Sequence, residues 1–173
     1  MDNCTPVQAS WHVLWTHSNY ERSVYEQLSA KGYELFFAKI DQWIASNKGK
    51  HLVRVPMFRS YLFIRHAIGK HDYIDINKTK GLVRILGDRW DQLASIPDHE
   101  IDSIRAVCAS DCPVRAYPFL KHGDRVRMVR GSLKNTEGIL LRNDDHTGLL
   151  VISVALLNRS VSVEVNCTDV VPL

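Results

Sequence analysis

Apolar and polar residues alternate in two different ways along this chain, and the change falls near residue 110. Before it, strand-like alternation is interleaved with helical spacing; after it, nearly every apolar run alternates with a period of two. Between the two parts, the stretch 108–118 contains Pro113 and Pro118, which disfavour regular structure. We therefore predict a domain over 8–107, a flexible linker over 108–118 and a second domain over 119–173.

The first part reads as strands and short helices, a pattern typical of an α+β sandwich. Alternation over 10–16, SWHVLWT, predicts a strand with both tryptophans and Val13 on one face. A helix should follow, since Ser18 and Glu21 stand at capping-box spacing and Gly32 suits the position past its end. The other expected elements are a strand over 33–40, a hairpin or loop up to 55, a strand over 60–66, a short helix over 72–81, a strand over 82–86 and a helix after Pro97.

The second part reads as a small curved barrel. In 123–140, GDRVRMVRGSLKNTEGIL, alternation points Val126 and Met128 into a core and Arg125 and Arg127 outward. Two glycines bound the loop between this strand and the next one. Three further strands are expected over 149–154, 159–165 and 169–171. We predict five strands that hold an exposed loop tip.

Composition limits the function classes only weakly. The 173 residues are 45% hydrophobic and 24% charged, which is ordinary for a soluble globular chain. The formal charge of +3 permits an anionic partner but does not demand one. The apolar runs are too short to span a bilayer and no targeting segment is evident, so we expect a cytoplasmic protein.

Catalytic and metal-binding patterns are missing from the sequence. The four cysteines are scattered, and Cys108 and Cys112 lack the second pair that a zinc site needs. The eight histidines show neither the spacing of a metalloprotease nor a partner in a nucleophile elbow. We expect no enzyme activity, no metal and no cofactor.

Three motifs in order resemble those of the NusG family of transcription elongation factors. They are WHVLWTHSNYERSV near the start, VPMFRSYLFI in the middle and a KOW motif over 123–142, and the resemblance covers nearly all of 10–172. It implies an NGN domain, an α/β sandwich with an antiparallel sheet, then a linker and an SH3-like KOW β-barrel. The implied function is that of a monomeric factor that binds the clamp helices of RNA polymerase and suppresses pausing and termination.

The resemblance also implies three groups of binding residues. The polymerase pocket would involve Trp15, Phe58, Tyr61, Phe63 and Leu86. Among these we expect Phe63 and Leu86 to be core residues, and Tyr61 and Phe58 to line the pocket.

Contact with non-template DNA would involve Asn77, Lys78, Thr79 and Lys80, flanked by Arg22 and Lys31. The alternative for these cations is a solvated charged face. The KOW loop, Arg130, Gly131, Ser132 and Leu133, would meet Rho or the ribosomal protein NusE.

Two departures from the family pattern favour a specialised paralogue. Phe58-Arg59-Ser60 replaces the usual Phe-Pro-Gly or Phe-Pro-Asn, and Gly131-Ser132-Leu133 replaces Gly-Pro-Phe. Both changes are compatible with a factor similar to RfaH or to the UpxY-like antiterminators of polysaccharide gene clusters. A refolding KOW domain, as in RfaH-like proteins, is disfavoured because β-branched residues fill its strands.

Two alternatives stay open. The chain could be a housekeeping elongation factor of the NusG type. It could also be an RNA-binding protein of ribosomal KOW type, in which Arg125, Arg127 and Arg130 grip RNA phosphates. The second alternative leaves the aromatic strand motifs without a purpose.

Overall fold

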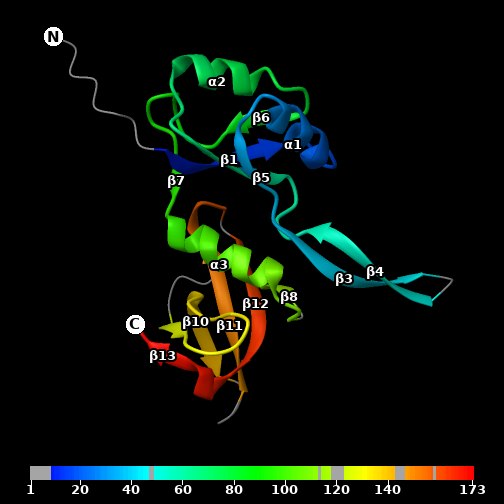
Figure 1. Ribbon diagram of the computed structural model, residues 1–173, viewed down its shortest axis with the longest axis vertical. Helices are drawn as coiled ribbons and strands as arrows, with labels where there is room; N and C mark the ends of the chain where they lie inside the picture. Colours follow the sequence, from blue (N-terminus) through cyan, green and yellow to red (C-terminus); the bar gives the residue numbers. More distant parts are fainter. Residues whose placement is uncertain (1–8, 47–48, 113, 118–122, 143–146, 158) are drawn as a thin grey trace. The chain divides into compact units, whose positions relative to one another are not determined.

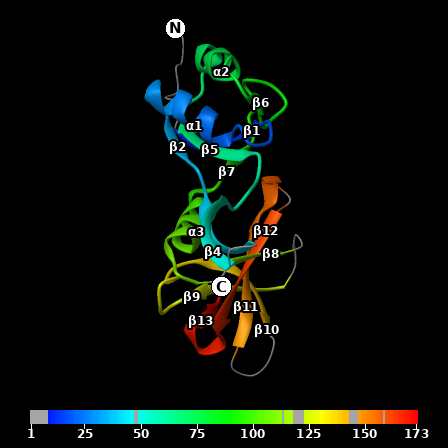
Figure 2. The same ribbon diagram turned by 90° about the vertical axis from the view of Figure 1, so that its right-hand side faces the viewer.

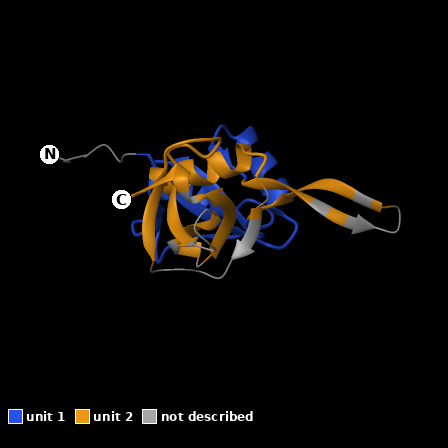
Figure 3. Ribbon diagram, turned by 90° about the horizontal axis from the view of Figure 1, so that it is seen from below, with its two compact units in different colours: residues 1–37, 58–97 blue, residues 38–57, 98–173 orange. Residues whose placement is uncertain are grey.

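The structure is a computed structural model and describes residues 9–46, 49–112, 114–117, 123–142, 147–157 and 159–173 (Figure 1). The chain divides into two compact units (Figure 3). Unit 1 comprises residues 1–37 and 58–97, and unit 2 comprises residues 38–57 and 98–173. The domain ranges 8–107, 108–118 and 119–173 stay predictions.

Unit 1 contains an antiparallel sheet. Its strands are β1 (Ser10–Thr16), β2 (Glu34–Phe36), β5 (Tyr61–His66), β6 (Leu82–Ile85) and β7 (Ser95–Ile96). The order is β2-β5-β1-β6, and β7 also pairs with β1. Strand β1 is central because β5 hydrogen-bonds along one edge while β6 and β7 share the other.

Two helices, α1 (Glu21–Ala30) and α2 (Lys70–Asn77), pack against one face of this sheet (Figure 2). The core between them combines Leu14, Leu62, Ile64 and Ile85 from the strands with Val24, Leu28 and Ile76 from the helices. Alternation along β1 explains the arrangement, because Leu14 points toward the helices and its neighbours Val13 and Trp15 point to the opposite face.

Unit 2 holds a hairpin, one helix and a curved sheet. The hairpin consists of β3 (Lys39–Ser46) and β4 (Gly49–Pro56), and it extends away from the other strands (Figure 3). The helix is α3 (Asp98–Ala109). The sheet contains β8 (Val114–Tyr117), β9 (Asp124–Met128), β10 (Glu137–Arg142), β11 (Thr147–Val154), β12 (Arg159–Asn166) and β13 (Val170–Pro172). Its order is β13-β9-β10-β11-β12-β8.

Helix α3 packs on strands β10 and β11 of this sheet. Ser103 joins the two elements, since its Oγ accepts a hydrogen bond from the backbone N–H of Glu137 at 3.2 Å and donates to the His99 carbonyl at 2.8 Å. Ile101 and Ile104 are fully buried. The helix therefore belongs to the core of unit 2.

Most predicted elements are confirmed, with four differences. The short helix expected over 72–81 spans Lys70–Asn77 instead. The segment expected as one strand over 33–40 divides into β2, which pairs with β5, and β3, which pairs with β4. The capping box is wrong: helix α1 begins after Tyr20 without a side-chain cap. The five expected barrel strands are present, and β8, from the stretch expected to be a linker, adds a sixth strand beside β12.

Candidate functional site

An aromatic pair, of which Trp15 is exposed and Tyr61 partly buried, lies on the sheet face opposite the helices of unit 1. Trp15 on β1 is the direct cross-strand partner of Tyr61 on β5 and of Arg84 on β6. Trp15 is 38% exposed, Tyr61 is partly buried, and the Arg84 guanidinium lies 5.7 Å from the centre of the Trp15 ring. This cation–π geometry keeps the ring at the surface with a positive charge beside it. We call Trp15, Tyr61 and Arg84 the aromatic strip.

The other predicted pocket residues lie in the interior. Phe58 and Phe63 are 4% and 0% exposed, and their rings meet edge to face at 6.1 Å. Leu86 is partly buried, and its N–H donates to the Val13 carbonyl at 2.9 Å. The burial of Phe63 agrees with its expected place in the core. Phe58 was expected to line the surface, but the turn before β5 directs its ring onto Phe63, where it supports the neighbouring strand.

The turn that precedes Tyr61 is fixed by a helix residue. Ser60 has a φ of 68°, in the left-handed region, and its N–H donates to Oε1 of Glu21 at 2.7 Å. The Ser60 carbonyl accepts from the N–H of Thr16 at 2.9 Å. Glu21 is 6% exposed. The buried Glu21 carboxylate therefore restrains this turn.

Sequence reasoning missed this role of Glu21. Its spacing from Ser18 favoured a capping box. In the structure the Glu21 carboxylate instead accepts a hydrogen bond from Ser60, 39 positions away in the sequence. The available signal was an acidic residue in the first turn of a helix.

The predicted DNA-binding segment begins at the end of α2. Lys78 and Lys80 are exposed, whereas Thr79 is 6% exposed and its hydroxyl has no partner among the described residues. Asn77 is partly buried, and its side-chain amide donates to the Tyr73 carbonyl at 2.8 Å. Lys78 and Lys80 are therefore the exposed residues of this segment and the ones available to bind DNA.

Both flanking cations are occupied by acidic neighbours. The Nζ of Lys31 donates to both carboxylate oxygens of Asp75, at 2.8 and 2.9 Å, and this interaction lowers the pKa of Asp75 below its usual range. Arg22 bonds Glu26 one helical turn away at 2.8 Å. Exposed pairs of this kind contribute little stability but neutralise charge locally. The positive charge that remains available on this surface comes from Lys78 and Lys80.

Helix α1 and the loop after α2 are joined by a side chain that sequence reasoning did not single out. The Nε2 of Gln27 donates to the Lys80 carbonyl at 3.0 Å and to Oγ of Ser23 at 3.1 Å. The loop that carries the two lysines is thereby held against α1.

The KOW loop presents fewer residues than expected. Gly131 has a φ of 77°, and its carbonyl accepts from the N–H of Lys134 at 3.2 Å. Arg130 and Ser132 are exposed, whereas Leu133 is 2% exposed and lines a small open pocket with Met128 and Val165. Leu133 therefore offers little surface to a partner.

One cation of the basic barrel strand is also paired. Nη2 of Arg127 lies 2.6 Å from Oε1 of Glu137, its cross-strand partner on β10. Arg125 is exposed, and Val126 and Met128 are buried as predicted. The pairing of Arg127 reduces the charge that this strand could offer to an RNA backbone.

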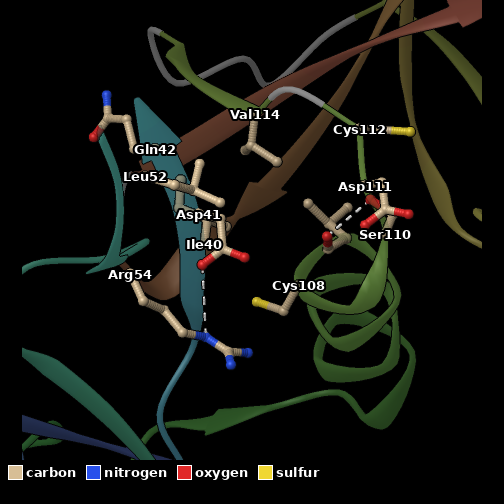
Figure 4. Close-up of a pocket in the computed structure, with 11 residues that line it drawn as sticks. Ile40, Asp41, Gln42, Leu52, Arg54, Cys108, Ser110, Asp111, Cys112 and Val114 are labelled. Atoms are coloured by element: carbon tan, nitrogen blue, oxygen red, sulfur yellow. Dashed lines mark hydrogen bonds and ion pairs between the residues drawn. The ribbon is translucent and has the colours of Figure 1, made fainter. Parts of the chain in front are cut away.

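Unit 2 also contains an open pocket of about 500 Å³ between the hairpin and the end of α3 (Figure 4). Asp41 and Arg54 approach each other across its hairpin side at 4.0 Å, while Cys108 and Asp111 border the helix side. Burial raises the pKa of the Cys108 thiol to about 11. This thiol stays protonated at neutral pH and is a weak nucleophile and metal ligand.

Metal-binding clusters and membrane-spanning helices are both absent from the part of the chain that the structure describes. It contains no group of three or more histidine, cysteine or acidic side chains placed to hold a metal ion. None of its helices is both long enough and apolar enough to cross a membrane.

Comparison with known proteins identifies relatives along most of the chain. A family model described as "Transcription termination factor nusG" matches residues 9–105, more than half of the sequence. The transcription termination/antitermination protein NusG of Pseudomonas aeruginosa is 23% identical over 170 residues, covering 92% of this chain and 96% of the relative. The protein of the same name from Borreliella burgdorferi is 25% identical over 178 residues, with the same coverage.

A solved structure has the same fold. NusG of Thermotoga maritima matches with a TM-score of 0.52 and 16% identity over 94% of this chain and 96% of that one. At this level of identity the likeness concerns the fold alone. It confirms the predicted α+β class with a KOW-like second part.

Proposed function

Because the chain belongs to the NusG family of transcription termination/antitermination factors, we propose that unit 1 binds the clamp helices of RNA polymerase through the aromatic strip and suppresses pausing and termination. Family members are transcription factors without enzymatic activity, and this chain is one of them.

The observation that carries the proposal is the exposure of Trp15 beside Tyr61. Partly exposed aromatic side chains next to an arginine are the residues that most often dominate protein interfaces. Phe63, two residues after Tyr61 on β5, meets Phe58 edge to face and stacks on Phe36 at 5.8 Å. This packing holds the strand that carries Tyr61, and a rigid strand lowers the entropic cost of binding.

Truncation of the strip tests this assignment. We expect Trp15→Ala and Tyr61→Ala each to weaken binding to purified core RNA polymerase by about 2 kcal/mol, roughly 30-fold in Kd. Trp90→Ala is the matched control, because Trp90 is 43% exposed but lies in the loop between β6 and β7, outside the strip. Equal retention of wild type and both strip variants on immobilised polymerase would contradict the proposal.

Contact with the displaced non-template DNA strand is the second part of the proposal. Lys78 and Lys80 supply the exposed cations for phosphate contacts, and the paired Lys31 and Arg22 contribute less. A partner of the KOW loop, either NusE or Rho, would meet Arg130 and Ser132, since Leu133 is buried.

A specialised role at one gene cluster completes the proposal. The turn at Phe58-Arg59-Ser60 and the buried Leu133 both depart from the family pattern at places where partners are expected. A terminator placed downstream of the chain's own operon leader, compared with the same terminator behind an unrelated promoter, distinguishes this role from that of a housekeeping factor. Equal readthrough of both reporters would assign the chain a general role.

The ribosomal-type alternative is less well supported. It relies on free arginines along β9, and Arg127 is engaged by Glu137. It also gives no role to the aromatic strip on unit 1.

A further inference from the structure

An exposed tyrosine lies against the backbone of the loop that carries the two exposed lysines. Tyr20, the residue before α1, is 42% exposed. A Cβ placed on Gly81 would lie 2.4 Å from Cδ1 of Tyr20 and 2.9 Å from its Cγ. Gly81 has a φ of 96°, and the absence of a side chain there is what allows the ring to approach so closely.

Further contacts fix the ring in this position. The N–H of His17 donates to the Gly81 carbonyl at 2.9 Å, and the N–H of Tyr20 donates to the His17 carbonyl at 3.1 Å. The imidazole of His17 meets the Tyr20 ring edge-on, with 6.2 Å between their centres. One side of the Tyr20 ring is thus backed by the loop and another by His17. We call Tyr20, His17 and Gly81 the tyrosine platform.

The platform is continuous in the chain with the exposed cations. Lys80 directly precedes Gly81, and its backbone carbonyl accepts a hydrogen bond from Gln27 of α1 at 3.0 Å, which holds the Lys80 backbone beside the platform. Lys78 lies two residues earlier and is also exposed. A fixed, exposed ring beside cations that neutralise phosphates is the combination with which proteins bind unpaired nucleic-acid strands.

We propose that the tyrosine platform binds an unpaired base of single-stranded DNA by stacking on Tyr20, while Lys78 and Lys80 contact the adjacent phosphates. Duplex DNA does not fit, because its bases are already stacked inside the helix and cannot reach the ring. This inference rests on the proposed contact with the displaced DNA strand. It adds that the contact includes stacking of a base on Tyr20 as well as attraction between lysines and phosphates.

Fluorescence anisotropy with the full-length protein and a short labelled thymidine oligonucleotide tests the proposal without polymerase. Tyr20→Leu keeps an apolar cover over Gly81 but removes the ring, and should weaken binding about tenfold. Tyr20→Phe keeps the ring and should bind as wild type does. Lys80→Gln should reduce the slope of log K against log salt by about 0.7, the value for one phosphate contact on a single strand.

Trp90→Leu is the control, because it removes an exposed ring elsewhere and should leave oligonucleotide binding unchanged. An RNA oligonucleotide of the same sequence that shows the same loss with Tyr20→Leu supports stacking and indicates indifference to the sugar. Wild-type affinity of Tyr20→Leu, or an equal loss for duplex DNA, overturns the proposal.

Failure of this inference can be told apart from failure of the proposed function. Tyr20→Leu should still be retained on core polymerase, because Tyr20 is outside the aromatic strip. If the wild type binds the oligonucleotide through Tyr20 but is not retained on polymerase, the result supports the tyrosine platform and contradicts the proposed polymerase contact.

Discussion

Among single residues, Glu21 at the start of α1 restrains a turn on another element. The residue is 6% exposed, and its carboxylate accepts the Ser60 N–H at 2.7 Å, which holds a non-glycine residue in the left-handed region. Such a conformation costs about 1 kcal/mol or more, so it persists only where neighbouring contacts impose it.

Removal of the Glu21 carboxylate should therefore destabilise unit 1. A hydrogen bond to a charged group contributes about 1.5 to 3 kcal/mol, and its loss leaves the Ser60 N–H without its acceptor. We expect Glu21→Ala to lower the free energy of unfolding by about 2 kcal/mol, measured by urea denaturation. Glu21→Gln retains an acceptor oxygen and should cost less than about 1 kcal/mol. Equal losses in the two variants would show that the contact with Ser60 is not the cause.

We expect His12 to make the stability of unit 1 depend on pH. It is 8% exposed, and its Nδ1 donates to the Ala94 carbonyl at 3.0 Å. Burial lowers the pKa of His12 below its usual 6.5, although the carbonyl bond acts in the opposite direction. The folded state therefore takes up a proton at lower pH than the unfolded state does.

The expected consequence is a loss of stability as pH falls below about 6.5, since protonation then favours the unfolded chain. Above that pH both states hold neutral His12, and the effect vanishes. The unfolding free energies of wild type and His12→Gln, measured side by side from about pH 8 to pH 5.5, should show the wild type losing more. Parallel curves would assign any pH dependence to other groups.

At the scale of elements, α1, the loop after α2 and β6 are tied together around Gly81. The Tyr20 ring covers this glycine and Gln27 donates to the preceding carbonyl, so two contacts join the loop to α1. Gly32 provides a comparison, because its φ of 88° is similar but a Cβ placed on it would have no atom within 4 Å.

The two glycines should respond differently to alanine. Gly32→Ala carries only backbone strain, about 1 kcal/mol. Gly81→Ala carries the same strain and must also displace Tyr20, so we expect a loss of about 2 kcal/mol or more. Thermal or urea unfolding measures both. In a Tyr20→Ala background the excess cost at position 81 should disappear; if it persists, the ring is not responsible for it.

Local patterns predicted the elements well, and long-range pairing explains what they missed. The alternation in β1, β5 and β9 is a property of neighbouring residues, so the buried faces of these strands could be predicted. The division of the segment 33–40 into β2 and β3 could not be predicted, because β2 pairs with β5 whereas β3 pairs with β4. The same holds for β8, whose pairing with β12 joins residues far apart in the sequence.

The candidate site shows the same division. The motif drew attention to Trp15, which is 38% exposed, whereas alternation alone placed it on the face of the buried Trp11 and Val13. Phe63 was expected in the core and is fully buried. Phe58 and Leu133 stand in turns, where the direction of a side chain depends on backbone geometry that sequence alone does not give. Their burial, and the bond between Glu21 and Ser60, became visible only in three dimensions.

At the scale of the molecule, the two proposed contacts of unit 1 meet at one hydrogen bond. Glu21 directly follows Tyr20 of the tyrosine platform, and its partner Ser60 directly precedes Tyr61 of the aromatic strip. Polymerase binding and strand binding would thus share a restraint even though they use different side chains. Residues in contact are where additivity of mutational effects fails.

Glu21→Ala should therefore weaken both interactions, whereas Tyr61→Ala weakens polymerase binding alone and Tyr20→Leu weakens oligonucleotide binding alone. Without the carboxylate, Ser60 can leave the left-handed region. Tyr61, which follows Ser60, and Tyr20, which precedes Glu21, would then lose the restraint on their backbone. Dissociation constants for core polymerase and for the oligonucleotide, measured where unfolding curves show each variant to be folded, give the comparison. If Glu21→Ala affects one interaction and spares the other, the contacts are independent and Glu21 serves only the stability of unit 1.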